Sequence, residues 1–401
     1  MDGSAQGKRA VLFLHTATLP PLGADTWVHV QLITKLDRAT HDLHIACVTG
    51  SASAPTPTYQ AVRDIPHLRV VPANLGTERS QATGRLAGLI ATLPALPTMV
   101  RLARHVRCHR IRVIHTSDRP RDALAAVVLA RLTGATSVVH VHVGYAPWMG
   151  RVLRWSLGRA NVLVAISEFV GRTLVEGGHR PDRIQVVLNA IDPSTWEPGV
   201  GRDEARQELG VEQGTPVVIT VCRLFKEKGP AELIRAIALV RHEYPDVKLL
   251  VVGSDVTGGA FTAELANLVE HLGVEENVTF TGRRSDVRRL MAAADVFAMP
   301  SFDEPFGLVY LEAMAMQLPV VALDNGGTPE VVEHGQTGLL SSSGDVEAVA
   351  RHLLTLLRSP DLRAQMGAQG RRRVEQHFTT DRQASDMAAV YALIESRSAR
   401  R

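Results

Sequence analysis

Short apolar runs alternate along the chain with longer segments in which apolar residues recur at helical spacing. This alternation predicts parallel β-sheets whose two faces are covered by helices. In the first half, strands are expected at 11–15, 43–48, 68–72, 112–115, 137–143, 161–166 and 184–188. Helices are expected at 26–38, 122–132 and 151–159, at 81–106 with a break near Pro94 and Pro97, and from Ser167-Glu168 onward.

The second half of the chain repeats the same alternation. Strands are expected at 216–221, 247–252, 278–281, 295–299 and 319–323. Helices are expected at 230–243, 262–272, 285–294, 307–316, 345–357 and 361–377. A last helix at 381–397 follows the final predicted strand by a long way, so it belongs to no strand–helix crossover.

Between the halves, the segment 189–201 interrupts the pattern with Asp192, Pro193, Pro198 and two glycines. The length of 401 residues exceeds the usual size of one hydrophobic core. We therefore predict an α/β protein of two doubly wound, Rossmann-like domains that face a central cleft. Open sheets of this kind bind ligands at the carboxyl ends of their strands.

Composition narrows the class of protein. Hydrophobic residues at 45% and charged residues at 21% are typical of a globular protein, and a net charge of +3 does not favour nucleic acid as a partner. The three cysteines have no CxxC spacing, which predicts a reducing cytoplasm and neither a disulfide framework nor a zinc site. The sequence shows no signal peptide and no apolar run long enough to cross a bilayer.

The stretch from Met299 to Glu312 carries the clearest chemistry. An apolar strand ends at Met299, a turn follows, and a helix begins near Leu308, which predicts free backbone N–H groups suited to an anion. Glu304 and Glu312 lie on either side of this site, and ionised carboxylates accept hydrogen bonds from hydroxyls. A phosphate between hydroxyl-bearing rings describes a nucleotide sugar. The alternative is an ordinary loop carboxylate and a solvated helix residue.

Two cations follow the first strand of the second half. Arg223 lies at the strand end and Lys228-Gly229 opens the next helix, which is a suitable pair for a diphosphate. Their neighbours Lys226 and Glu227 fit a solvated turn better. The glycines of the later segment 324–330 would let the backbone approach a ligand closely, or they simply form a turn.

Histidines mark strand ends in the first half. His140 and His142 share one face of a strand, where His140 fits a core histidine and His142 lies at the end before Gly144. Metal binding by this pair would require further ligands, and the sequence indicates none. His115 and Ser117 lie at another strand end with the same ambiguity. The chain contains neither GxGxxG nor a Walker phosphate loop, which counts against a dinucleotide dehydrogenase or an NTPase.

These motifs resemble those of the retaining glycosyltransferases of family 4, the glycosyl transferases group 1, which have the glycosyltransferase B fold. The resemblance rests on Glu304 and Glu312 with seven residues between them, Phe306-Gly307 included, on Arg223 with Lys228-Gly229, on 326–330 and on 189–192. It implies a metal-independent hexosyltransferase (EC 2.4.1-like) without a cofactor. The donor is expected to be a nucleoside diphosphate sugar, with UDP favoured and GDP or ADP possible.

The resemblance also assigns residues. Arg223 and Lys228 are expected to bind the diphosphate, Glu304 to face the donor sugar, and Glu312 to hold the ribose hydroxyls. The expected catalytic residues are Glu304, His142, Arg223 and Lys228. Donor contacts are further expected from Gly23, Arg283, Phe306, Gly307, Leu308, Val309 and Glu312, with Arg283 beside the base, backbone amides of the 306–309 turn at the phosphates, and His142 lining the sugar site.

The resemblance implies a division of labour between the domains. Residues 1–190, with a helix at 381–401 crossing back onto them, are expected to bind a small-molecule or glycolipid acceptor, and 191–380 the donor. A monomer or homodimer is expected in the cytoplasm, and the basic cluster Arg101–Arg112 leaves a contact with the inner face of the membrane open. A non-catalytic regulator, or an epimerase or phosphorylase of the same fold, remains an alternative.

Four positions depart from the usual family pattern, and they bear on acceptor binding and catalysis. Ala24 replaces a second glycine, Cys222 a glycine before the arginine, and Ala190 a glycine after Asn189. Ser117 stands where some members carry a second histidine.

Overall fold

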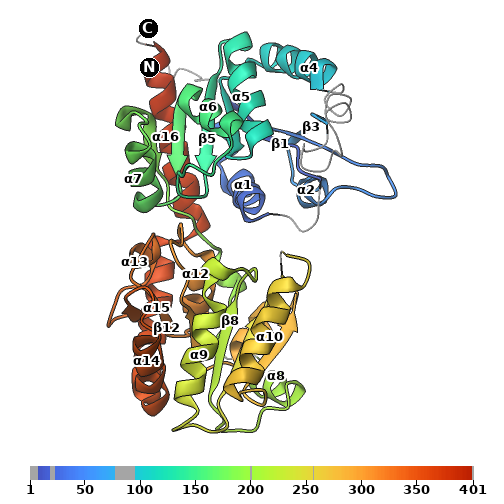
Figure 1. Cartoon of the computed structure of the whole chain (residues 1–401). Coiled ribbons are helices and arrows are strands. Elements are labelled where there is room, and N and C mark those ends of the chain that lie inside the picture. Colours follow the sequence, from blue (N-terminus) through green and yellow to red (C-terminus); the bar gives the residue numbers. More distant parts are fainter. Residues whose placement is uncertain (1–7, 19–22, 77–94, 199–200, 256, 400–401) are drawn as a thin grey trace. The chain divides into compact units, whose positions relative to one another are not determined.

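The computed structural model describes residues 8–18, 23–76, 95–198, 201–255 and 257–399. The chain forms two compact units, Met1–Leu188 with Thr380–Arg401, and Asn189–Thr379 (Figure 1). Each unit is an α/β layer structure built on one parallel sheet, so the predicted fold class is confirmed.

The first unit contains a seven-stranded sheet of order β3-β2-β1-β4-β5-β6-β7, in which every described pair is parallel. Its strands are β1 (Arg9–His15), β2 (His41–Cys47), β3 (Arg69–Pro72), β4 (Val113–Ser117), β5 (Thr136–Val141), β6 (Val162–Ala165) and β7 (Ile184–Val186). Its helices are α1 (Ala24–Lys35), α2 (Pro57–Val62), α4 (Ala95–Cys108), α5 (Pro120–Thr133), α6 (Arg151–Arg159), α7 (Glu168–Glu176) and α16 (Thr380–Ala399). The strand order reverses between β1 and β4, so the carboxyl ends of these strands form the switch point where ligands of such sheets bind.

The second unit contains a six-stranded parallel sheet of order β10-β9-β8-β11-β12-β13. Its strands are β8 (Val217–Val221), β9 (Lys248–Val252), β10 (Val278–Gly282), β11 (Val296–Met299), β12 (Val320–Leu323) and β13 (Gly338–Ser341). Its helices are α8 (Arg202–Glu208), α9 (Pro230–Val240), α10 (Ala260–Leu272), α11 (Val287–Ala293), α12 (Leu308–Ala315), α13 (Thr328–Val331), α14 (Val346–Arg358) and α15 (Pro360–His377). Here the order reverses between β8 and β11.

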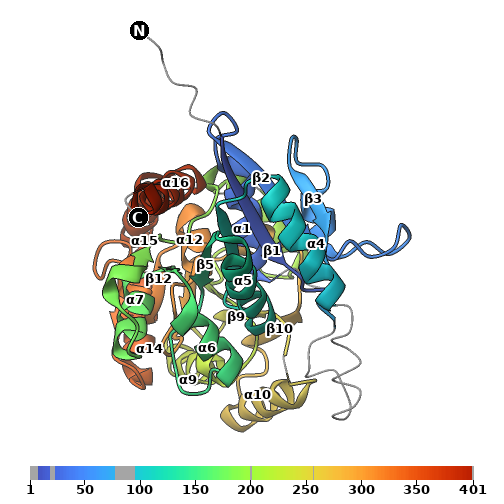
Figure 2. The same ribbon diagram turned by 90° about the horizontal axis from the view of Figure 1, so that it is seen from above.

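Each unit has its own hydrophobic core, built on the apolar strands of its sheet. In the first unit, α4 and α5 pack side by side against β1 and β4 (Figure 2), which buries Leu102, Leu129, Leu12 and Ile114. None of the helices in the described part of the chain combines the length and apolarity that a membrane crossing requires.

Helix α16 packs within the first unit. The hydroxyl of its buried Tyr391 lies 2.5 Å from Nδ1 of His115 on β4. At its ends, Asp381 pairs with Lys35 at 3.1 Å and Glu395 with Arg9 at 3.0 Å. Helix α16 therefore packs against the sheet of the first unit, although it follows the second unit in sequence.

Most predicted elements are confirmed within two or three residues, and the misses have local causes. Strand β13 has only four residues, begins with a glycine and follows a turn, so its apolar content gave no clear signal. Helix α8 is short and strongly charged, and no helix was predicted for its residues. Of the helix predicted at 81–106, the part from Ala95 is confirmed as α4, and the part before it lies outside the described residues.

Candidate functional site

In the second unit, the predicted donor residues collect at the carboxyl edge of the sheet. Arg223 and Lys228 lie in the connection between β8 and α9, and Glu304 lies between β11 and α12. Since β8 and β11 are neighbours at the point where the strand order reverses, the two connections meet there. The sheet topology thus brings together residues that are about 80 positions apart in sequence.

Lys228 and Glu304 form an ion pair at this edge. Nζ of Lys228 donates to Oε2 of Glu304 at 2.5 Å, and Oγ of Ser301 donates to the same oxygen at 2.9 Å. Glu304 is only 7% exposed. These two hydrogen bonds and its burial fix the position of the carboxylate. An ammonium has three donors, which leaves Lys228 able to contact an anion while it keeps Glu304.

Glycines let the loops of this site pack closely. Gly229 has φ +70°, and a side chain there would run into the carbonyl of Pro300. Gly326 has φ +59°, and its Cβ would lie 2.5 Å from the carbonyl oxygen of Glu304, while the N–H of Gly327 donates to that oxygen at 2.7 Å. The close approach made by Gly326 and Gly327 is therefore to the Glu304 loop.

The second cation, Arg223, is exposed and shares an aromatic neighbour with Lys228. Cζ of Arg223 and Nζ of Lys228 lie 5.5 and 5.6 Å from the ring centroid of Phe225. Both are within cation–π range, so the ring contributes to the placement of both positive groups. No role for Phe225 was predicted from the sequence, although its position between the two candidate cations Arg223 and Lys228 could have indicated one.

Helix α12 begins beside this pair. Gly307 is its N-cap residue with φ +87°, and the amide groups of its first turn include those of Leu308 and Val309, both half-buried. The side chain of Phe306 is 1% exposed and packs edge-on against Phe378 at 5.9 Å. Any ligand contact from Phe306 must therefore come from its backbone, because its ring belongs to the core.

Glu312 lies one turn into α12, and burial raises its pKa to about 7. Its half-buried position does not fit a fully solvated helix residue. Arg283 directly follows β10 and is exposed.

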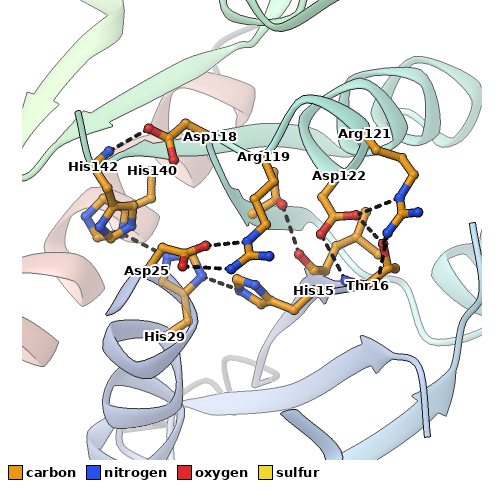
Figure 3. Close-up of polar contacts among 12 residues, drawn as sticks. His15, Thr16, Asp25, His29, Asp118, Arg119, Arg121, Asp122, His140 and His142 are labelled. Carbon is orange, nitrogen blue, oxygen red and sulfur yellow. Dashed lines mark hydrogen bonds and ion pairs between the residues drawn. The ribbon is translucent and has the colours of Figure 1, made fainter. Parts of the chain in front are cut away.

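In the first unit, five histidine rings meet beside the carboxyl edge of the sheet. They are His15 at the end of β1, His29 on α1, His115 on β4, and His140 and His142 on and just after β5. Nε2 of His15 lies 2.5 Å from Nδ1 of His29, and Nε2 of His29 lies 3.0 Å from Nδ1 of His140 (Figure 3). The first four rings are fully buried.

Burial sets the charge of these rings. It lowers the pKa of His15 to about 4 and the pKa values of His29, His115 and His140 well below the usual range. For His142, burial also lowers the pKa, while the nearby Asp118 and Asp25 carboxylates oppose that shift. The cluster is therefore a group of neutral imidazoles near pH 7.

Two carboxylates border the histidines. Oδ2 of Asp118 accepts the backbone N–H of His142 at 2.9 Å, and burial raises the pKa of Asp118. Asp25, in the first turn of α1, pairs with Arg119 at 2.6 Å; burial opposes its ionisation, but the guanidinium keeps the pKa of Asp25 below its usual value (Figure 3). Gly23 is the N-cap residue of α1, where a side chain would collide with Asp25 and lie 2.7 Å from Arg119.

Sequence reasoning named His142, His140 and His115 but missed His29. A signal exists, because His29 lies one helical turn after Asp25 on the helix that follows the glycine-containing loop. Ser301, which holds Glu304, was read only as a turn residue.

A cavity of about 500 Å³ lies in the second unit, at the opposite edge of the sheet from Lys228 and Glu304. It is found at the amino-terminal ends of β8 and β11, and its charged lining includes Arg206 and Asp295, which pair at 3.0 Å. Arg206 also donates to the carbonyls of Ala293 and Thr215. These satisfied charges indicate a structural role.

Comparison with protein families gives two matches. Residues 201–373 match the family described as glycosyl transferases group 1, and residues 26–195 match glycosyltransferase family 4. Alpha-maltose-1-phosphate synthase of Mycolicibacterium smegmatis is 32% identical over 309 residues, covering 64% of this chain and 79% of the relative. N-acetyl-alpha-D-glucosaminyl L-malate synthase of Bacillus anthracis is 31% identical over 255 residues, covering 62% of this chain and just under two thirds, 64%, of the relative.

Solved structures with the same fold include HepE of Anabaena in complex with UDP and glucose. It has a TM-score of 0.78 and 25% identity, over 96% of this chain and 99% of that one. Sucrose-phosphate synthase of Thermosynechococcus elongatus also has a TM-score of 0.78, with 23% identity over 97% of this chain and 100% of that one. The second likeness shows the fold alone.

Proposed function

Because the chain belongs to glycosyltransferase family 4, as its family matches and relatives show, we propose that it transfers a sugar from a nucleoside diphosphate sugar to a hydroxyl acceptor. The observation that carries this proposal is the Lys228–Glu304 pair. It lies at the switch point of the second sheet, next to the first turn of α12 and the exposed Arg223. Cations and helix amides suit a diphosphate, and a fixed carboxylate suits a sugar.

The proposed chemistry divides charge between the residues of this edge. As the bond from sugar to diphosphate breaks, negative charge builds on the leaving group and positive charge on the sugar ring. Arg223, Lys228 and the amides of Leu308 and Val309 would stabilise the former, and Glu304 would position the latter. Fixed side-chain cations then serve where a metal ion serves in other transferases, which supports a metal-independent reaction.

The finer assignments are proposals as well. From the resemblance to the retaining enzymes of family 4, we propose that the configuration at the anomeric carbon is retained. On the same ground we propose that the sugar is a hexose and that the leaving nucleotide is UDP. HepE, crystallised with UDP and glucose, supports UDP. Another relative, from Corynebacterium glutamicum, is named as GDP-mannose-dependent, so GDP is the alternative to test. We also propose that His142 lies at the sugar, Gly23 near the phosphate and Arg283 beside the base.

A nucleotide screen tests the donor assignment. We expect UDP at about 100 times its dissociation constant to stabilise the protein by about 2.7 kcal/mol, a rise of roughly 5–10 °C in the unfolding temperature of a unit of this size. GDP and ADP at the same concentration serve as comparisons, and the Lys228→Ala variant as the control for binding at this site. The absence of a shift with every nucleotide would contradict the proposal.

Glu312 gives the donor affinity a predictable dependence on pH. Its carboxyl, with a pKa of about 7, must ionise before both of its oxygens can accept the ribose hydroxyls. We expect UDP-glucose, whose diphosphate is doubly esterified and does not titrate in this range, to bind about 20-fold more weakly at pH 5.5 than at pH 7.5. Calorimetric titration at both pH values measures the change. The Glu312→Gln variant should bind weakly at both, and a pH-dependence that survives in it would exclude Glu312 as the cause.

The same carboxyl affects stability with the opposite sign. Its pKa is raised from 4.5, so the folded, ligand-free protein binds more protons than the unfolded chain between about pH 4.5 and 7. Glu312 therefore lowers stability as the pH rises through this window, by up to about 3 kcal/mol. Bound donor is expected to offset this cost, since it supplies partners to the ionised group.

A further inference from the structure

The histidine cluster of the first unit has more nitrogen atoms than its hydrogen bonds use. Three neutral imidazoles, His15, His29 and His140, carry three N–H groups, and the two bonds that link them use only two. The third N–H must lie at one end of the row, at Nδ1 of His15 or Nε2 of His140. Both atoms are buried and have no hydrogen-bond partner among the described residues. A buried polar atom without a partner is costly, so the hydrogen bonds within this row do not satisfy all of its nitrogen atoms.

His142 lies next to this row. Nε2 of His142 is also buried without a partner among the residues described, and the rings of His140 and His142 lie 4.6 Å apart (Figure 3). One nitrogen each of His29, His140 and His142 lies within 4.8 Å of the others, and the described residues form no other such group. Two imidazole nitrogens on a tetrahedral zinc ion, each bonded at about 2.0–2.1 Å, are roughly 3.3 Å apart. Nε2 of His29 and Nδ1 of His140 are joined by a hydrogen bond and lie 3.0 Å apart, so an ion that replaced this bond would find the two nitrogens near that spacing.

We propose that His29, His140 and His142 form a binding site for one divalent cation of the zinc type. Imidazole ligands favour zinc, copper and nickel over magnesium and calcium, which prefer oxygen. The position of His15 fits this assignment, because its bond to Nδ1 of His29 orients that ring, while the ion would take the place of the bond between Nε2 of His29 and His140. The carboxylates of Asp118 and Asp25 lie beside the cluster and offset part of the added charge.

The site shares His142 with the proposed sugar-binding residues. Under the proposed function, a bound ion would hold this ring away from the sugar, so zinc would inhibit transfer. That consequence rests on the proposed function, whereas the binding of the ion does not. Binding measured without substrate therefore separates the two: sugar transfer can fail while the ion still binds, and the reverse also holds.

Titration of the chelator-treated, full-length protein with zinc chloride tests the site. We expect one equivalent to bind per chain in calorimetry, and cobalt(II) at the same site to give the visible absorption of a low-coordinate ion. Replacing His142, whose side chain is partly exposed, with glutamine should weaken zinc binding by at least about tenfold, and so should His29→Gln. Thermal unfolding confirms that each variant is folded.

Two variants serve as matched controls. His109→Gln alters a histidine outside the cluster, whose ring packs with those of His44 and His105, and should leave zinc affinity unchanged. Lys228→Ala, in the second unit, should also bind zinc as the unaltered chain does. The proposal is overturned if the unaltered protein shows no saturable zinc binding, or if His142→Gln, folded, binds zinc as tightly as the unaltered chain.

Discussion

Replacing Lys228 with alanine is expected to slow sugar transfer by about 100-fold or more when the donor is saturating. The change removes a cation that is held beside Phe225 and would face the leaving diphosphate. It also leaves Glu304, a carboxylate that is 7% exposed, without its ion-pair partner. The turnover number and the dissociation constant of UDP are the quantities to measure.

The variant Lys226→Ala is the matched control for this prediction. Lys226 lies two residues earlier in the same connection but is exposed. Its removal should change turnover by less than a factor of two or three, since a solvated surface charge contributes little. Normal turnover in the Lys228→Ala variant at saturating donor would show that the diphosphate does not depend on this cation, and the site assignment would then be wrong.

Much of the fold was predictable because both sheets are parallel and buried on two faces. Such strands are continuous apolar runs, as in β5 and β11, and the helices between them have the matching period. These apolar runs do not indicate the order of the strands within the sheet. The pairing of β8 with β11 instead of β10 depends on crossovers that the sequence pattern does not encode, and this pairing joins Lys228 to Glu304.

In the candidate site, too, some features could be predicted from the sequence and others could not. Single groups such as Glu304 and Arg223 stand out because charged residues that follow the ends of strands need a partner or a ligand. Contacts that require three-dimensional placement could not be read: Ser301 on Glu304, and the glycines at 326 and 327 packing on the Glu304 loop. The histidine cluster is the clearest case. Strand alternation placed His140 and His142 on one face, but only the packing of α1 on the sheet adds His29.

The second large effect is expected at Glu304. Glutamine keeps the size of this side chain and removes its charge, and we expect it to lower turnover by about 100-fold, because the carboxylate would face a sugar that becomes positive as its bond to the diphosphate breaks. UDP alone should behave differently. Without the carboxylate, Lys228 is released to the diphosphate and a nearby like charge is gone, so UDP should bind as tightly as before or severalfold more tightly.

This opposition separates the roles of the two partners. Lys228→Ala should weaken UDP binding and slow turnover together, whereas Glu304→Gln should slow turnover alone, which is the signature of an interaction used in the transition state. Ser301→Ala is the graded control: it removes one hydrogen bond to Glu304 and should cost about 1 kcal/mol, or severalfold in rate. If Glu304→Gln weakens UDP as much as Lys228→Ala does, the pair acts as one structural unit of the loop, and the carboxylate has no separate role at the sugar.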